Sequence, residues 1–145
     1  MLVGRVRNLP LVEWRPGVLT RLHTAGAAGA ESLCVMEQLC DPGAGAPPHR
    51  HDGVEEMILV LEGRACVHVS GEETELGAGD SVVCPAGSRH GFTNVGTDSL
   101  RILAVFASPI PTTEYEDEPG VVLEIGGHGP RRRDAHRAER PGRPR

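Results

Sequence analysis

The sequence predicts a single all-β domain, and three observations support this prediction. Short apolar runs, each about as long as one strand, recur along the chain between turn residues. A content of 19 glycines and 12 prolines makes the chain rich in turns and disfavours a helix bundle. No segment before residue 130 repeats its apolar residues with the helical period of about 3.6. The 145 residues suffice for one hydrophobic core, so these features favour a β-sandwich or a small barrel.

The expected strands cover residues 17–23, 32–40, 56–61, 65–70, 81–84, 91–94, 100–107 and 121–125. Turns rich in glycine or proline separate them at 25–29, 41–48, 71–72, 77–79, 85–87 and 96–98. In two of the strands, 56–61 and 100–107, both alternating faces are apolar, so we expect both faces to be buried. A small sandwich usually leaves one face wet. We therefore expect a partner subunit or a terminal segment to cover the second face, and we predict a homodimer.

The predicted domain covers residues 1–130, with the barrel strands at about 17–107. Residues 108–130 are expected to form an acidic arm, in which 109–120 is a surface loop or extended arm and 121–125 is an edge strand. Residues 131–145 are rich in arginine and polar on every side, which predicts a flexible tail. A short helix at 131–140 and a contact with nucleic acid are the alternatives for this tail.

Composition and charge exclude several classes of protein. All 15 basic residues are arginine; eight of them lie in residues 1–130, against 18 acidic residues. An acidic body does not suit a nucleic acid partner, and four aromatic residues are too few for a base-stacking surface. No apolar run approaches the roughly 20 residues of a membrane span, and charges interrupt the N-terminal segment, so we expect no signal peptide. The four cysteines form no C-x-x-C pair and are expected to be reduced, buried thiols of a cytoplasmic protein.

A pair of histidines carries the strongest chemical indication. His49 and His51 flank Arg50, and residues two apart on a strand point the same way, so both imidazoles can reach one point in space. A carboxylate follows them. Simple alternation selects Glu55, whereas a reset of the alternation at the Asp-Gly turn of residues 52–53 selects Glu56.

A third histidine, His90, opens the predicted strand that contains Phe92 and Asn94 on the same face. Three imidazoles and one carboxylate make a mixed nitrogen and oxygen donor set that suits Fe, Mn, Ni, Cu or Zn as a divalent ion. Calcium is disfavoured because it prefers oxygen ligands. We therefore expect one divalent transition metal per chain.

Two spaced motifs resemble those of the cupins. The first is Gly, five residues, His-x-His, three or four residues, Glu, six residues and Gly, and it is matched by Gly43, His49, His51, Glu56 and Gly63. The second is Gly, five residues, Pro-x-Gly, two residues, His, three residues and Asn, and it is matched by Gly79, Pro85, Gly87, His90 and Asn94. The spacing to Gly63 favours Glu56 over Glu55. The resemblance implies a double-stranded β-helix, which is a jelly-roll barrel, with His49, His51, Glu56 and His90 as the metal ligands.

The resemblance also implies a small-molecule substrate. Four protein ligands on a six-coordinate metal leave two positions for substrate, water or O2. We expect a metal-dependent dioxygenase that acts on a small enolisable or anionic organic substrate, with Glu56 as a general base. The alternatives are a redox-neutral isomerase, epimerase, lyase or cyclase that uses the metal as a Lewis acid, and a non-catalytic module that binds a small ligand.

Further residues are assigned to the substrate pocket. Phe92 is expected to line the cavity because it shares the face of His90. Arg21 and His23 share one strand face and are candidates to bind a substrate carboxylate. His68 is expected outside the ligand set, in support of it or on the surface. A thiol dioxygenase is disfavoured, because such cupins use a tyrosine near the metal and Tyr115 falls in the acidic loop.

Overall fold

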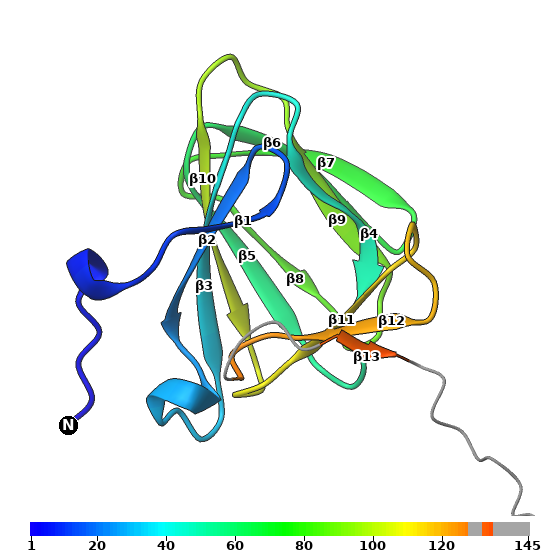
Figure 1. Ribbon diagram of the computed structural model, residues 1–145. Coiled ribbons are helices and arrows are strands. Elements are labelled where there is room, and N and C mark those ends of the chain that lie inside the picture. The colour runs from blue at the N-terminus through cyan, green and yellow to red at the C-terminus, as the bar shows by residue number, and fades with distance from the viewer. Residues whose placement is uncertain (128–131, 135–145) are drawn as a thin grey trace, which may run out of the picture.

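Two antiparallel sheets face each other across one core in the computed structural model, which describes residues 1–127 and 132–134 (Figure 1). The first sheet contains, in order of pairing, β1 (Val12–Arg15), β2 (Val18–Thr24), β3 (Cys34–Cys40), β10 (Leu100–Phe106), β5 (Glu56–Glu62) and β8 (Ser81–Cys84). The second contains β13 (Arg132–Asp134), β12 (Val121–Glu124), β11 (Thr112–Tyr115), β4 (Gly45–Arg50), β9 (His90–Asn94), β6 (Arg64–Val69) and β7 (Glu72–Gly77). Two short 3-10 helices, η1 (Val6–Asn8) and η2 (Gly26–Ala28), precede β1 and β3.

The chain passes repeatedly from one sheet to the other between β3 and β11. Consecutive strands in this stretch therefore lie opposite each other, apart from the β6–β7 hairpin. This winding is that of a jelly-roll barrel, so the predicted all-β double-stranded β-helix is confirmed. No helix among the described residues is long or apolar enough to span a membrane.

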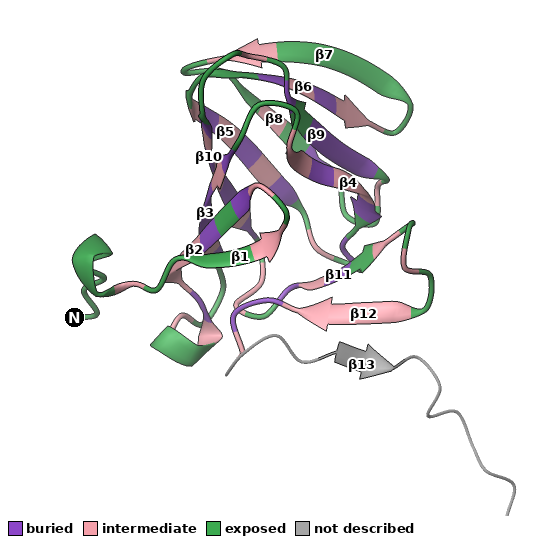
Figure 2. Cartoon of the chain, turned by 45° about the horizontal axis from the view of Figure 1, so that its top comes forward, coloured by how far each residue is buried: buried purple, intermediate pink, exposed green. Residues whose placement is uncertain are grey.

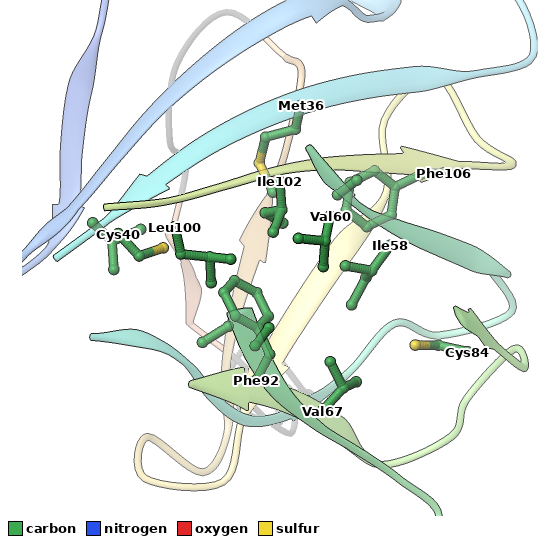
Figure 3. Packing of buried hydrophobic residues seen from close by; sticks show 14 of the residues in the cluster. Met36, Cys40, Ile58, Val60, Val67, Cys84, Phe92, Leu100, Ile102 and Phe106 are labelled. Carbon is green, nitrogen blue, oxygen red and sulfur yellow. The ribbon is translucent and has the colours of Figure 1, made fainter. Parts of the chain in front are cut away.

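The core lies between the two sheets and is built from alternate residues of each strand. On β5 and β10 the inward residues Ile58, Val60, Ile102 and Phe106 are almost fully buried, and their side chains meet those of the facing sheet (Figure 3). The intervening residues are only half-buried, as the alternating colours along β5 and β10 show (Figure 2). The face of β5 and β10 that points into the barrel is thus buried, as predicted. The opposite face is only partly covered by residues of the same chain.

One strand replaces a predicted turn. Residues 41–48 were expected to form a turn because of their glycines and prolines, yet β4 starts at Gly45. The pairing of β4 with β9 shifts register between Ala46 and His49, which places Pro47 and Pro48 in an irregular stretch. Proline has no N–H to donate, so it is accepted in a strand where ladder hydrogen bonds are interrupted.

The acidic arm is also more ordered than expected. Residues 109–120 do not form a surface loop throughout, because β11 pairs with both β4 and β12. The edge strand expected at 121–125 is present as β12, although β13 pairs with its outer side. β13 falls within the segment predicted to be a flexible tail or a short helix; residues 131 and 135–145 of that segment lie outside the described residues.

The cysteines are free thiols, as expected. Cys34, Cys40 and Cys84 are buried in the core, whereas Cys66 is only half-buried. Burial raises the pKa of each of the three core thiols to about 12, so they are protonated and unreactive at neutral pH.

Candidate metal centre

Four buried side chains converge inside the barrel: His49, His51, Glu56 and His90. One ligand atom of each lies within 4.8 Å of all the others. His49 lies near the end of β4 and His51 directly follows that strand, whereas Glu56 begins β5 and His90 begins β9. The structure therefore brings together all four residues that the two motifs indicated.

The turn after His51 decides which carboxylate joins this cluster. Gly53 has a φ of 65°, in the left-handed region that favours glycine, and the turn reverses the alternation of the chain. As a result Glu55 is exposed while Glu56 is only 4% exposed. Glu56, not Glu55, therefore lies with the three imidazoles, and its role as a ligand stays a prediction.

The second motif places His90 by a tight turn. The Ser88 amide donates a hydrogen bond to the Pro85 carbonyl oxygen at 3.0 Å, and Gly87 adopts a φ of 72°. His90 then pairs with His49 across β9 and β4, and their ring centroids are 4.3 Å apart. The turn and the strand pairing together set the direction of the third imidazole.

The chemistry of the donors fits a divalent transition metal. The Nδ1 atom of each imidazole faces a main-chain carbonyl oxygen: that of Pro47 for His49 at 2.7 Å, Thr112 for His51 at 2.8 Å and Ser88 for His90 at 3.0 Å. A carbonyl oxygen only accepts, so we assign the proton to Nδ1 in all three rings. The Nε2 atoms are then the ones available to bind a cation, as in metal sites whose imidazoles donate their other N–H. In the protein alone, Nε2 of His51 and Nε2 of His90 hydrogen-bond to Glu56 Oε2 at 2.9 and 2.7 Å, so a metal ion would take the place of the shared protons.

The charges of the four side chains are coupled. Burial opposes protonation of His90, but the hydrogen bond and charge interaction with Glu56 outweigh it and raise the pKa of His90. Burial and the neighbouring His90 and His51 lower the pKa of His49 to about 3, so this ring is neutral at pH 7. Burial opposes ionisation of Glu56, but hydrogen bonds and charge interactions with His51 and His90 outweigh it and lower its pKa to about 2. A neutral imidazole beside an ionised carboxylate is the form that binds a metal ion.

A small chamber adjoins three of the four ligands, His49, His51 and Glu56. Its volume is about 20 Å³, and besides the ligands it is lined by Trp14, Met36, Gln38, Ala46, Phe92, Phe106, Thr113, Tyr115 and Ile125. Phe92 therefore lies where the sequence predicted it. Phe106 packs against His51 and Tyr115 against His49, with ring centroids 5.0 and 5.1 Å apart.

Phe92 is the only one of these nine lining residues that the sequence assigned to the pocket, and Trp14, Thr113 and Tyr115 are among those missed. Thr113 and Tyr115 alternate with the exposed Glu114 on β11, so the period-two pattern was present but was too short to stand out in an acidic segment. The structure places Tyr115 beside His49, not in a loop. The position of Trp14 had no indication in the sequence.

Arg21 and His23 do not line the chamber. Both contact Glu37 on β3: His23 Nε2 hydrogen-bonds to the carboxylate, and Arg21 Nε lies 3.4 Å from its Oε2. The flanking residues Met36 and Gln38 do line the chamber, so alternation places Glu37 on the outer face of the sheet. The expectation that Arg21 and His23 bind a substrate carboxylate is therefore not supported by their positions.

His68 lies outside the cluster, as expected. It pairs with Gly91 between β6 and β9, and its ring occupies the space above that glycine. A Cβ atom at Gly91 would come within 2.6 Å of His68 Cε1. His68 therefore packs against the backbone of the strand that carries His90, without reaching the ligand atoms.

A larger cleft of about 560 Å³ adjoins the chamber. It lies among β1, β11 and β12, and it shares four lining residues with the chamber: Trp14, Thr113, Tyr115 and Ile125. These four residues form a wall between the cleft and the ligand cluster. The cluster is thus separated from the cleft by a single layer of side chains.

Comparison with known proteins identifies the family. Residues 36–106 match the Cupin_2 family, described as a cupin domain. The chain is also 30% identical over 132 residues to the polyketide synthase CurC of Streptomyces cyaneus, covering 88% of this chain and 86% of that protein. The chain is a small cupin.

Two further relatives show the chemical range of this cupin's neighbours. The solved structure of the polyketide cyclase RemF from Streptomyces resistomycificus superposes with a TM-score of 0.62 at 27% identity, over 73% of this chain and 78% of that one. A gentisate 1,2 dioxygenase of Aquipseudomonas alcaligenes is 36% identical over 86 residues, which are 58% of this chain and 23% of that protein. The cupin spans about half the length of several other curated relatives.

Proposed function

We propose that this cupin is a metal-dependent cyclase that closes a ring in a neutral, enolisable polyketone. The observation that carries the proposal is the cluster of three imidazoles and one carboxylate, whose donor atoms converge within 4.8 Å behind a wall of largely apolar and aromatic side chains. The similarity to CurC along most of both chains, and to the cyclase RemF, favours cyclisation among the redox-neutral reactions open to such a site.

His49, His51, Glu56 and His90 would hold the metal, which supplies Lewis-acid polarisation of a substrate carbonyl. Glu56 is the only carboxylate among the described residues that line the chamber, so we assign it the transfer of the proton from carbon to the departing oxygen. Its low pKa keeps it ionised and makes it a weak base, which restricts it to an already acidified C–H bond. Phe92 and Phe106 keep water away from the reacting carbon.

The reaction forms one carbon–carbon bond between an enolate carbon and a ketone carbon of the same substrate molecule. The ketone oxygen then leaves as water, and no electron is gained or lost. The test is to incubate the zinc-loaded protein with a synthetic poly-β-ketone thioester under argon. A product that has lost one water is expected, and it should be absent with the His49→Ala protein.

A dioxygenase is the second candidate. The similarity to a gentisate 1,2 dioxygenase over 86 residues favours it, and the same donor set leaves metal positions for O2. Loading with Fe(II) and measuring oxygen uptake separates the two reactions. Uptake that matches product formation, with both oxygen atoms retained in the product, would replace the cyclase proposal.

We also infer a homodimer in the cytoplasm. The half-buried outer faces of β5 and β10 include Met57, Leu59, Leu103 and Val105, which form a continuous apolar surface across paired strands. The four free thiols suit a reducing compartment. Sedimentation should give twice the chain mass of 15.4 kDa, and Leu59→Arg should give a monomer. A monomeric parent protein at micromolar concentration would exclude the dimer.

A further inference from the structure

The chamber beside the ligands is too small for an organic substrate. Its volume of about 20 Å³ accommodates about one water molecule. The cleft of about 560 Å³ on the other side of the shared wall is within the range of small-molecule sites. A substrate that reaches the cluster must therefore keep most of its body in the cleft and pass its reacting end through the wall.

The lining of the cleft selects against anionic ligands. Its apolar part comes from Val12, Trp14, Leu123 and Ile125, and the charged residues beside these are Glu13, Arg15, Glu118 and Glu124. Arg15 is the only cation among the described lining residues, and it already binds Asp117 through both terminal nitrogens, at 3.1 and 3.2 Å. A substrate carboxylate thus has no unpaired cation to bind in the described cleft, whereas a neutral apolar body finds a complementary surface.

The same arginine holds the wall in place. Its guanidinium carbon lies 3.9 Å from the ring centroid of Tyr115, in the geometry of a cation–π contact. The Tyr115 ring also packs against His49. Asp117, Arg15 and Tyr115 therefore form a chain of contacts from the protein surface to the metal ligand, with Tyr115 closing the passage.

We propose that this cleft binds the flat, apolar body of a neutral β-dicarbonyl substrate, and that the Asp117–Arg15–Tyr115 contacts are a latch that opens to admit its reacting end. The proposal rests on the proposed function for the identity of the reacting end. Binding of the body depends only on the cleft, so the two proposals can fail separately.

The chain contains one tryptophan, Trp14, and it lies in the shared wall. Its fluorescence therefore reports on binding without any need for turnover. Dibenzoylmethane serves as the neutral, flat β-diketone probe, and oxalate serves as the small dianion. Each is added to the full chain in two forms: loaded with zinc, and freed of metal by excess chelator (the chelated form). We expect dibenzoylmethane to quench Trp14 saturably in both forms and more tightly with zinc, and oxalate to cause no quenching in the chelated form.

Two exposed valines give a matched pair of variants. Val12 lines the cleft and is 47% exposed, whereas Val95 is 41% exposed in a turn away from it. Val12→Arg should weaken dibenzoylmethane binding to the chelated protein about tenfold, because it adds a charge and removes apolar contact, and Val95→Arg should leave binding unchanged. Leu123→Arg on β12 tests the opposite side of the cleft. Unchanged affinity in both cleft variants, or quenching by oxalate in the chelated protein, would overturn the cleft assignment.

The latch is tested by the rate of association in stopped flow. Arg15→Met removes the ion pair with Asp117 and the charge above Tyr115, and it should speed dibenzoylmethane binding to the zinc form about fivefold. Arg64→Met removes a comparable exposed ion pair, with Glu75, and should leave the rate unchanged. Equal rates for Arg15→Met and the parent protein would overturn the latch. A protein that passes both tests but does not cyclise polyketones would contradict the proposed function alone.

Discussion

The main-chain amide of Gly87 donates a hydrogen bond to the carbonyl oxygen of His51, with a distance of 2.9 Å between nitrogen and oxygen. This contact joins the two segments that supply the ligands, since Gly87 belongs to the turn before His90. Each segment therefore restrains the other, and the cluster behaves as one unit.

Glu56→Gln should abolish tight metal binding. The amide keeps the shape of the side chain but loses the negative charge that balances the cation, and we expect the metal affinity to fall by at least about 100-fold. The measurement is competition with a chromophoric chelator, supported by elemental analysis. Glu55→Gln is the matched control, because that neighbouring side chain is exposed and should not affect affinity. Equal affinities of the two variants would exclude Glu56 as a ligand.

Removal of metal should lower the stability of the whole domain. A ligand that binds only the folded state adds about 4 kcal/mol at a free concentration 1,000 times its dissociation constant. Thermal unfolding of the zinc-loaded protein should therefore occur at a higher temperature than that of the protein in excess chelator. The His49→Ala protein should show no such difference. A metal-dependent shift of equal size in that variant would mean that zinc binds elsewhere.

Gly45→Ala should disturb the cluster from a distance. A Cβ atom at Gly45 would lie 2.0 Å from the Phe92 carbonyl oxygen, so β4 and β9 would have to separate at the Gly45–Thr93 pair, and the shift would be passed along the same two strands to the pair of His49 and His90. We expect a loss of about 2 kcal/mol of unfolding free energy together with weaker metal binding. Gly77→Ala on β7 is the control, since the nearest atom to its Cβ would be 3.7 Å away. Urea unfolding and chelator competition measure the two effects; an unchanged Gly45→Ala protein would contradict the close approach.

Glu37→Gln should destabilise the protein at neutral pH but not in acid. Burial opposes ionisation of Glu37, but hydrogen bonds with His23 and Arg101 outweigh it and lower the pKa of this carboxyl below its ordinary value of 4.5. Because folding lowers this pKa, ionised Glu37 stabilises the folded state fully above pH 4.5. This stabilisation is lost as the pH falls through the pKa that Glu37 has in the folded protein.

The free energy of unfolding of Glu37→Gln should be lower by about 2 kcal/mol at pH 7. This loss is smaller than that for a fully buried ion pair, because the basic partners of Glu37 are partly exposed. Urea unfolding of the variant and of the parent protein, followed from neutral to acid pH, should show this difference shrinking below pH 4.5. Glu62→Gln removes a more exposed carboxylate that also contacts Arg101, and it should change stability little at any pH. A pH-independent difference for Glu37→Gln would show that lost packing, not charge, explains the effect.

The sequence carried most of the information about the ligand cluster. His49 and His51 are related by strand alternation, the turn at 52–53 is marked by its residues, and a short turn precedes His90. These are local relationships, so they can be inferred without the fold. The gap of six residues to Gly63 in the first motif then favours Glu56 over Glu55.

The substrate side of the site could not be obtained in the same way. Alternation divides a strand into two faces but does not say which face is inside. On β2 the polar Thr20 faces the core, where it accepts a hydrogen bond from Gln38 at 3.1 Å, while Leu19 is exposed with Arg21 on the same side. The side chains of the wall come from β1, from β11 and from Ile125 after β12, which are distant in sequence, and only the packing of one sheet against the other brings them together.

The three imidazoles take their orientation from the peptide oxygens of Pro47, Thr112 and Ser88. Every residue type carries this acceptor, so replacing those side chains leaves it in place wherever the backbone path is kept. The residues that surround a ligand can therefore diverge while the metal geometry persists. Such a scaffold can acquire new substrates by altering its walls alone, which gives a physical basis for mutational robustness at the centre and rapid adaptation around it.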